Sequence, residues 1–199
     1  MKVLQIKTSL NGDNSMSNKL SNAIVDEIKK KHSSVQLTER NLAKKNLPHF
    51  SLQHFEAFSN NPEMDVQEKE KIIKISDELI NEIEQAEIIV IGVPVYNLTI
   101  PSTLKSWIDF ITRAQKTFRY TTEGPIGLIT DKKVYIAISS GGIYSDGSRK
   151  SQDFTEPYLR TILGFLGIND ITTIRVEGLS IPDINDTAFS KALQRIEID

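Results

Sequence analysis

Apolar and polar positions follow two different periods along this chain, and the two periods alternate. Short runs rich in β-branched residues are typical of strands, whereas apolar residues that recur every three or four positions indicate amphipathic helices. The strand pattern is found at Val3–Ile6, Ser34–Arg40, Glu87–Val93, Lys133–Ile138 and Ile171–Val176. The helix pattern is found at Ser17–Lys31, Val66–Gln85, Pro101–Ile111, Phe154–Phe165 and Thr187–Ile196.

The alternation predicts an α/β fold. Glu87–Val93 is a nearly continuous β-branched run, which a central strand covered on both faces requires. Parallel strands need crossover connections, and a helix after each strand supplies them. We therefore predict one domain, residues 1–199, with a five-stranded parallel sheet and helices on both faces. Asn41–Pro62 is expected to be loop with short helical turns, and Phe118–Asp131 an excursion or hairpin, because it holds turn-forming glycines.

Composition and charge exclude several functions. The net charge is −2, and Lys29–Lys31 ends a predicted helix, so nothing indicates nucleic-acid binding or an anionic membrane. The chain has no cysteine, and its three histidines lack metal-ligand spacing, so no metal site is expected. With no signal-peptide pattern and no apolar run of membrane-spanning length, we expect a soluble cytoplasmic protein.

Three connectors are expected to meet at one edge of the sheet. In open α/β sheets, ligands bind outside the carboxyl ends of the strands, near the point where the strand order reverses. This rule selects Thr8–Ser17, Pro94–Ile100 and Ser139–Gly147, which we call the first, second and third connectors. Each is unusually polar, aromatic or rich in glycine for a simple connection.

The first connector predicts a phosphate site. It carries hydroxyls at Ser9, Ser15 and Ser17, and it leads into a helix N-terminus, where free N–H groups and the helix dipole favour an anion. It lacks both the Gly-Lys-Ser/Thr of a P-loop and the Gly-x-Gly-x-x-Gly of dinucleotide folds, so a single terminal phosphate fits best. The alternative is that Ser15 or Ser17 only caps the helix.

The other two connectors are placed to hold a flat ring. Backbone amides and the Asn97 side chain would pair with its edge, and Tyr96 would lie against the ring or its side chain, unless Tyr96 instead covers the core. Glycines in the third connector let backbone N–H groups approach a ligand, unless this segment is a simple turn before Tyr144.

Together, the connectors predict a mononucleotide of flavin type. A flavin accepts hydride at N5 and builds negative charge near N1 and O2, which amides of Gly141 and Gly142 would stabilise. The cofactor carries the chemistry, so no catalytic side chain and no Ser-His-Asp set is needed.

At these residues the sequence resembles the FMN-dependent NADH-azoreductase (NADH:quinone oxidoreductase) family of flavodoxin-like enzymes. The matching pieces follow one another along nearly the whole chain, and their combination is specific although each alone is weak. They are Ser9 with Ser15–Asn18, Pro94–Leu98, Leu104–Asp109, Thr117–Tyr120, Ser139–Gly142, Pro157–Leu159 and Gly164–Ile168.

The resemblance implies a flavodoxin-like three-layer sandwich that forms a homodimer, with one non-covalent FMN per subunit at the subunit interface. It also implies ping-pong transfer of two electrons from NADH, or sometimes NADPH, to quinones or aromatic azo compounds. Carried over, the phosphate would be held by Ser9, Ser15, Met16 and Ser17, and the ribityl chain and ring by Pro94, Val95, Tyr96, Asn97, Leu98, Ser139, Ser140, Gly141 and Gly142. Phe118 and Tyr120 are candidates for stacking on nicotinamide or acceptor, the alternative being that they form hairpin core.

Three positions depart from the family pattern. Val95, Leu98 and Ser140 stand where many relatives have methionine, an aromatic residue and arginine, which bears on the acceptor and on the choice of nicotinamide. Two other functions compete with a reductase: a flavodoxin-like one-electron carrier, and a non-catalytic binding or regulatory protein on the same scaffold. The modest charge of −2 and the excursion at Phe118–Asp131 argue against the carrier, which is usually shorter and strongly acidic.

Overall fold

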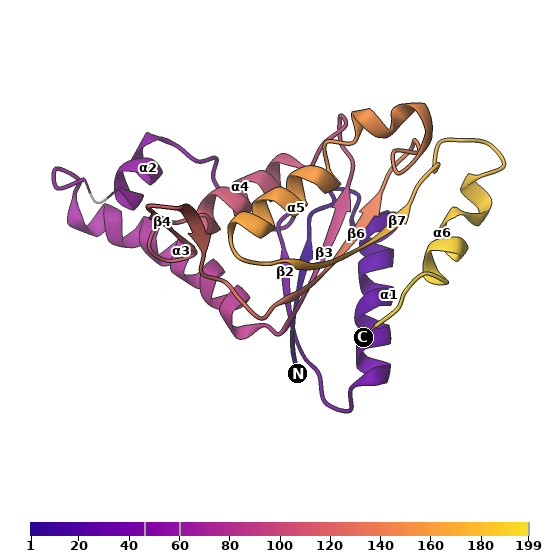
Figure 1. Cartoon of the computed structure of the whole chain (residues 1–199), viewed down its shortest axis with the longest axis horizontal. Helices are drawn as coiled ribbons and strands as arrows, with labels where there is room; N and C mark the ends of the chain where they lie inside the picture. The colour runs from indigo at the N-terminus through magenta and orange to yellow at the C-terminus, as the bar shows by residue number, and fades with distance from the viewer. Residues whose placement is uncertain (46, 60, 199) are drawn as a thin grey trace.

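The protein is built around one parallel sheet. The computed structural model describes residues 1–45, 47–59 and 61–198, and shows the sheet with strand order β2-β1-β3-β6-β7 (Figure 1). Every neighbouring pair in this sheet is parallel. Its strands are β1 (Lys2–Lys7), β2 (Gln36–Asn41), β3 (Ile88–Pro94), β6 (Lys133–Ser139) and β7 (Asp170–Val176). The order reverses beside β1, between the first and the third strand of the chain, as in flavodoxin-like sheets.

Helices cover both faces of the sheet. In Figure 1, α1 and α6 lie on one side, and α3, α4 and α5 lie on the other. The helices are α1 (Met16–Lys31), α2 (Leu52–Phe58), α3 (Val66–Gln85), α4 (Ser102–Ile111), α5 (Glu156–Phe165) and α6 (Asn185–Leu193), with short 3-10 turns at η1 (Gly12–Asn14) and η2 (Gly147–Gln152). The predicted five-stranded parallel sheet with helices on both faces is confirmed.

The alternation of side chains along each strand separates two apolar cores. Ile89, Ile91 and Val93 of β3 point toward α3, α4 and α5, whereas Ile88 and Val90 point toward α1 and α6. All seven residues of β3 are buried. This explains why β3 has apolar residues at consecutive positions instead of alternating ones.

Helix α5 starts later than its apolar pattern suggested. The expected helix began at Phe154, but α5 begins at Glu156, after a turn in which the Asp153 carboxylate accepts N–H bonds from Thr155 (2.9 Å) and Glu156 (3.2 Å). A side chain that bonds its own backbone two or three residues ahead forms a turn, which here replaces the first turn of the helix.

The expected excursion at Phe118–Asp131 is a two-stranded hairpin of β4 (Phe118–Thr121) and β5 (Gly124–Gly127). The hairpin docks against the C-terminal end of α5, because Phe118 packs on Phe165 with ring centroids 4.6 Å apart. Within the described residues we find no helix whose length and apolarity would let it span a bilayer.

Candidate functional site

The three connectors meet because β1, β3 and β6 are neighbours in the sheet and run in the same direction. Hydrogen bonds join the connectors to one another. The Tyr96 hydroxyl lies 3.3 Å from the Ser9 hydroxyl, and the Val95 N–H donates to the Ser139 carbonyl at 2.8 Å. The loops selected from the sequence therefore form one continuous surface at the carboxyl edge of the sheet.

The first connector presents hydroxyls and free amides at the start of α1. Ser15 is the N-cap, since its Oγ accepts the Asn18 N–H at 3.2 Å, and the same Oγ lies 3.0 Å from that of the buried Ser17. The N–H groups of Met16 and Ser17 belong to the first turn of the helix, which has no earlier carbonyl to bond. Ser15 therefore does cap the helix, and the cap also orders a pair of hydroxyls beside free N–H groups.

The second connector contains a tight turn with an unusual backbone. Tyr96 and Thr99 exchange two backbone hydrogen bonds (2.9 and 3.1 Å), while Asn97 and Leu98 between them have φ of 51° and 70°. Two positive φ values are typical of a type I′ turn, which favours asparagine or glycine. A leucine in this region is strained, and strained backbone is found most often at functional sites.

The third connector directs its carbonyls away from the other two. The carbonyls of Ser140, Gly141 and Gly142 accept N–H bonds of 3.0 to 3.2 Å from a turn at residues 178–180. In a planar trans peptide the N–H points opposite to the preceding carbonyl, so the N–H groups of Gly141 and Gly142 face away from that turn. Among the described residues, the N–H groups of Gly141 and Gly142 have no hydrogen-bond partner.

Gly141 makes room for protein rather than for a ligand. A Cβ at this position would lie 2.6 Å from the Oγ and 3.3 Å from the Cβ of Ser180. The sequence had suggested that Gly141 is needed so that a ligand can approach the backbone. The position that a Cβ would occupy, however, faces the 178–180 turn. A side chain there would push the turn that holds the connector's carbonyls.

This geometry gives a prediction for Gly141→Ala. We expect the dissociation constant for FMN to rise about tenfold, because moving the 178–180 turn misaligns the amides. Ser180→Gly in the same chain should restore binding, since it removes both colliding atoms. Fluorescence titration of the apoprotein measures this, with Ser180→Gly alone as the control; failure of the double variant to recover would mean that the ligand itself needs the space.

A cavity of about 670 Å³ opens beside the second connector. This size lies within the range of about 300–1,000 Å³ that is usual for small-molecule sites. Its residues come from the second connector, α4, α5 and the segment before α2, and include Asn97, Lys105, Asp109 and Tyr158. Burial raises the pKa of the Tyr158 phenol, and Asp109 adds to the effect while Lys105 opposes it, so the phenol keeps its proton at neutral pH.

The segment after β2 is anchored by an aromatic cluster. The ring centroids of Phe50 and His54 lie 6.0 and 5.0 Å from that of Phe110 on α4, each in an edge-to-face arrangement. Burial lowers the pKa of His54, whose Nδ1 accepts the Ser51 N–H at 3.0 Å. His54 belongs to α2, a short helix within the segment Asn41–Pro62 that was expected to be loop with short helical turns, and the cluster holds His49 and Phe50 at the wall of the cavity.

Phe118 and Tyr120 do not reach this surface within one chain. Phe118 is 7% exposed and packs on Phe165, the last residue of α5. Helix α5 has ten residues and is about 15 Å long, so Phe165 lies far from the end of the helix that is nearer the third connector. Figure 1 shows the hairpin on that side, beside α3. The packing favours hairpin core for Phe118, whereas Tyr120 is 71% exposed.

Sequence reasoning missed two residues at the rim of the site. The Phe154 N–H donates to the Leu98 carbonyl at 3.3 Å, and the Leu10 N–H donates to the Tyr96 hydroxyl at 3.3 Å. Both side chains are exposed. An exposed apolar side chain beside a predicted ligand loop is the signal that could have found them.

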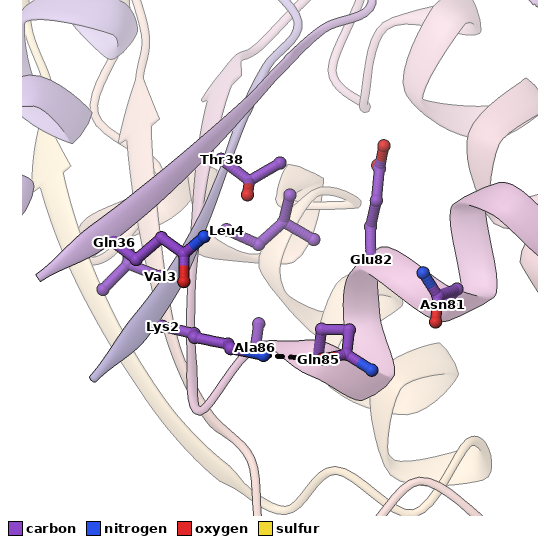
Figure 2. Close-up of a pocket in the computed structure, with 9 residues that line it drawn as sticks. All are labelled: Lys2, Val3, Leu4, Gln36, Thr38, Asn81, Glu82, Gln85 and Ala86. Atoms are coloured by element: carbon purple, nitrogen blue, oxygen red, sulfur yellow. Dashed lines mark hydrogen bonds between the residues drawn. The ribbon is translucent and has the colours of Figure 1, made fainter.

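A second cavity, of about 350 Å³, lies at the other end of the sheet (Figure 2). It is lined by the first residues of β1 and β2 and by the end of α3, where the Lys2 ammonium donates to the Gln85 side chain at 2.7 Å. These are the amino ends of the strands, where ligands do not usually bind in this kind of sheet.

The site at the carboxyl edge suits a planar anion with a phosphate tail. In the part of the chain that the structure describes, all three connectors carry N–H groups without a hydrogen-bond partner, and the first connector has hydroxyls and a helix N-terminus but no lysine or arginine within Thr8–Ser17. Fixed amide dipoles of this kind stabilise negative charge on a ring without any group that titrates. The arrangement therefore fits FMN.

Comparisons with known proteins agree with this geometry. A family model described as a flavodoxin-like fold matches residues 1–198. The chain is 42% identical to the FMN-dependent NADH:quinone oxidoreductase of Herminiimonas arsenicoxydans over 180 residues, 90% of this chain and 88% of that protein. It is also 42% identical to the enzyme of the same name from Cellvibrio japonicus, over 98% of this chain and 96% of that one.

Solved structures with the same fold include two from Bacillus anthracis. One is an azoreductase of strain Sterne, with 31% identity and a TM-score of 0.89 over 98% of this chain and 96% of that one. The other is an FMN-dependent NADH-azoreductase of strain Ames Ancestor in complex with FMN, with 26% identity and a TM-score of 0.88 over the same shares.

Proposed function

Because this chain belongs to the flavodoxin-like family of FMN-dependent NADH:quinone oxidoreductases, we propose that the three connectors form its flavin site. The chain is an FMN-dependent oxidoreductase that takes electrons from NADH and reduces quinones and aromatic azo compounds. The observation that carries the proposed site is that, among the described residues, all three connectors hold N–H groups without a hydrogen-bond partner where they meet at the carboxyl edge of the sheet.

Each connector has a separate role in this proposal. Ser9, Ser15, Ser17 and the amide of Met16 hold the phosphate. Pro94, Val95, Tyr96, Asn97 and Leu98 hold the ribityl chain and one edge of the ring, and Ser139, Ser140, Gly141 and Gly142 hold the other edge. Support comes from the free amides of the first turn of α1, of the 97–98 turn and of Gly141 and Gly142.

Bound FMN supplies hydride acceptance and donation, and the chain's own groups tune and position it. The Gly141 and Gly142 amides provide a fixed positive potential where negative charge develops. We place the nicotinamide and the acceptor, in turn, at the open face next to the 670 Å³ cavity, which makes the order ping-pong. The protonated Tyr158 phenol at that cavity is a source for the proton that a reduced quinone needs.

We propose that the enzyme acts as a cytoplasmic homodimer, each chain being one domain. Exposed apolar side chains on α2, on the hairpin and directly after it support the dimer, because such surface is usually covered. They are Leu52, Phe55, Tyr120, Ile126 and Leu128. In the dimer, Tyr120 would be able to contact the site of the second chain. Sedimentation velocity would show whether the dimer exists. The absence of cysteine from the sequence fits the reducing cytoplasm.

Anaerobic mixing with NADH tests the function directly. The purified chain should bind FMN and turn yellow, and NADH alone should bleach the flavin within one turnover. Steady-state rates with a benzoquinone and a simple azo dye, each with NADH or NADPH, then rank acceptors and donors, and parallel double-reciprocal lines identify ping-pong order. Bound FMN that stays oxidised in NADH would indicate a one-electron carrier instead, and a chain that binds no FMN would contradict both functions.

A further inference from the structure

A nearly buried arginine lies at the end of β7, surrounded by three carboxylates. The Arg175 side chain is 9% exposed and pairs with Asp153, with Glu156 (2.5 Å) and with Glu177 (3.3 Å). Burial alone would lower the pKa of Arg175, but the hydrogen bond with Glu156 and the charge of Asp153 outweigh it and raise the pKa. A buried guanidinium with three acidic partners is a fixed structural element, because leaving any one of these charges unpaired is costly.

Two of the three carboxylates also hold the backbone of the segment Tyr144–Thr155, which we call the arch. At its first foot, Glu177 accepts the N–H groups of Tyr144 (2.8 Å) and Ser145 (3.1 Å). At its second foot, Asp153 accepts the Thr155 N–H at 2.9 Å. The middle of the arch, which includes η2, is exposed to solvent. Arg175 is therefore the group that joins the two feet.

Each foot of the arch is attached to a different wall of the proposed flavin site. The first foot begins two residues after Gly142, and the Gly142 carbonyl is itself bonded to the Gly178 N–H at 3.1 Å, next to Glu177. Beside the second foot, the Phe154 N–H donates to the Leu98 carbonyl at 3.3 Å. The third and second connectors are thus linked through the arch, and Arg175 closes the link.

We propose that Arg175 is a positioning residue that sets the spacing between the Leu98 turn and the Gly141–Gly142 amides by fastening both feet of the arch. The inference rests on the proposed flavin site. A planar guanidinium can donate hydrogen bonds to more than one carboxylate at once, and a single ammonium group cannot do so with the same geometry. Without Arg175, three neighbouring carboxylates repel one another and the feet separate.

The effect should be confined to the ring end of the flavin. The arch is attached to the connectors that hold the ring, whereas the phosphate is held by the first connector. Loss of Arg175 should therefore weaken FMN and riboflavin by the same factor, since the two differ only in the phosphate. A general loss of stability would instead lower the melting temperature without raising the dissociation constants of FMN and riboflavin by the same factor.

The test uses Arg175→Met and Arg175→Lys in the full chain. We expect Arg175→Met to raise the dissociation constants of FMN and riboflavin alike, by about 10- to 100-fold, and Arg175→Lys to give an intermediate rise. The matched control is Arg160→Met, which removes the bond from Arg160 Nε to Glu156 (2.7 Å) in the same cluster, and the bonds from Arg160 to the Ile171 carbonyl and the Thr173 hydroxyl, but touches neither foot. It should leave both constants within about twofold of wild type.

Fluorescence titration of the apoproteins, with circular dichroism as a check of folding, decides the outcome. If folded Arg175→Met binds both ligands as the wild type does, or loses affinity for FMN only, the proposal is wrong. If Arg175→Met does not fold, Arg175→Lys decides on the same criteria. Wild-type protein that binds neither ligand would contradict the flavin site itself, which separates that failure from a failure of the arch.

Discussion

Replacing Ser15 and Ser17 together by alanine is expected to raise the dissociation constant for FMN about 100-fold while leaving that for riboflavin almost unchanged. The two hydroxyls lie 3.0 Å apart at the start of α1, beside first-turn amides that have no earlier carbonyl to bond. A hydrogen bond to a charged group contributes at least about 1.5 kcal/mol, so two such bonds contribute about 3 kcal/mol, which corresponds to roughly 100-fold. Riboflavin has no phosphate and does not use them.

The double variant also loses a helix cap, so its control must lose one too. The Ser15 hydroxyl accepts the Asn18 N–H, and removing a cap costs about 1 kcal/mol of stability. Asp65→Ala is matched, because the Asp65 carboxylate caps α3 by accepting the Glu68 N–H at 3.0 Å, away from the connectors. It should lower stability similarly and leave FMN binding unchanged. Equal losses of FMN and riboflavin in the serine variant would disprove the phosphate assignment.

Gly127→Ala is expected to lower the free energy of unfolding by about 3 kcal/mol, at the upper end of what overpacking usually costs. A Cβ on Gly127 would overlap the backbone of Leu166 and Gly167, which cannot turn aside as a side chain can. The hairpin would have to move off the end of α5 and break the bond from the Ile129 N–H to the Leu166 carbonyl (2.9 Å). Urea denaturation of the apoprotein measures the loss.

Gly164→Ala is the matched control, because Gly164 lies close by on α5. A Cβ there would meet only the Asn169 side chain, at an ordinary contact distance of 3.5 Å. Alanine in a helix also avoids the entropy that glycine loses, so this variant should be neutral or more stable by up to about 1 kcal/mol. If Gly127→Ala were as stable as the control, the hairpin would not be docked on α5 as described.

Local patterns in the sequence were sufficient for most elements. The predicted Val66–Gln85 helix has the same bounds as α3, and the apolar run of β3 is buried along its whole length. These predictions are correct because they depend only on the period of apolar side chains along the chain, which can be read from the sequence. Segments governed by a side chain that bonds its own backbone, such as Asp153 before α5, were placed less well.

Features that join distant segments could not be found in this way. Arg175 lies 22 residues along the chain from Asp153, and each of them looks like an ordinary surface charge in the sequence. Asn97 and Leu98 lack the Asn-Gly signature of a type I′ turn, so the turn could not be recognised before the backbone was known. Phe118 matched a ligand-stacking motif, yet it packs against Phe165.

By itself, the sequence determined that β-strands and helices alternate and that polar connectors follow the first, third and fourth strands of the parallel sheet. Since parallel strands share one carboxyl edge, those connectors had to lie on the same side of the molecule. Only the tertiary structure decided that β1, β3 and β6 are adjacent, that the third connector turns its carbonyls toward residues 178–180, and that Arg175 closes the arch. The physical reason is that hydrophobic patterning fixes which face of an element is buried, whereas partners far apart in the chain are chosen by the packing of the whole molecule.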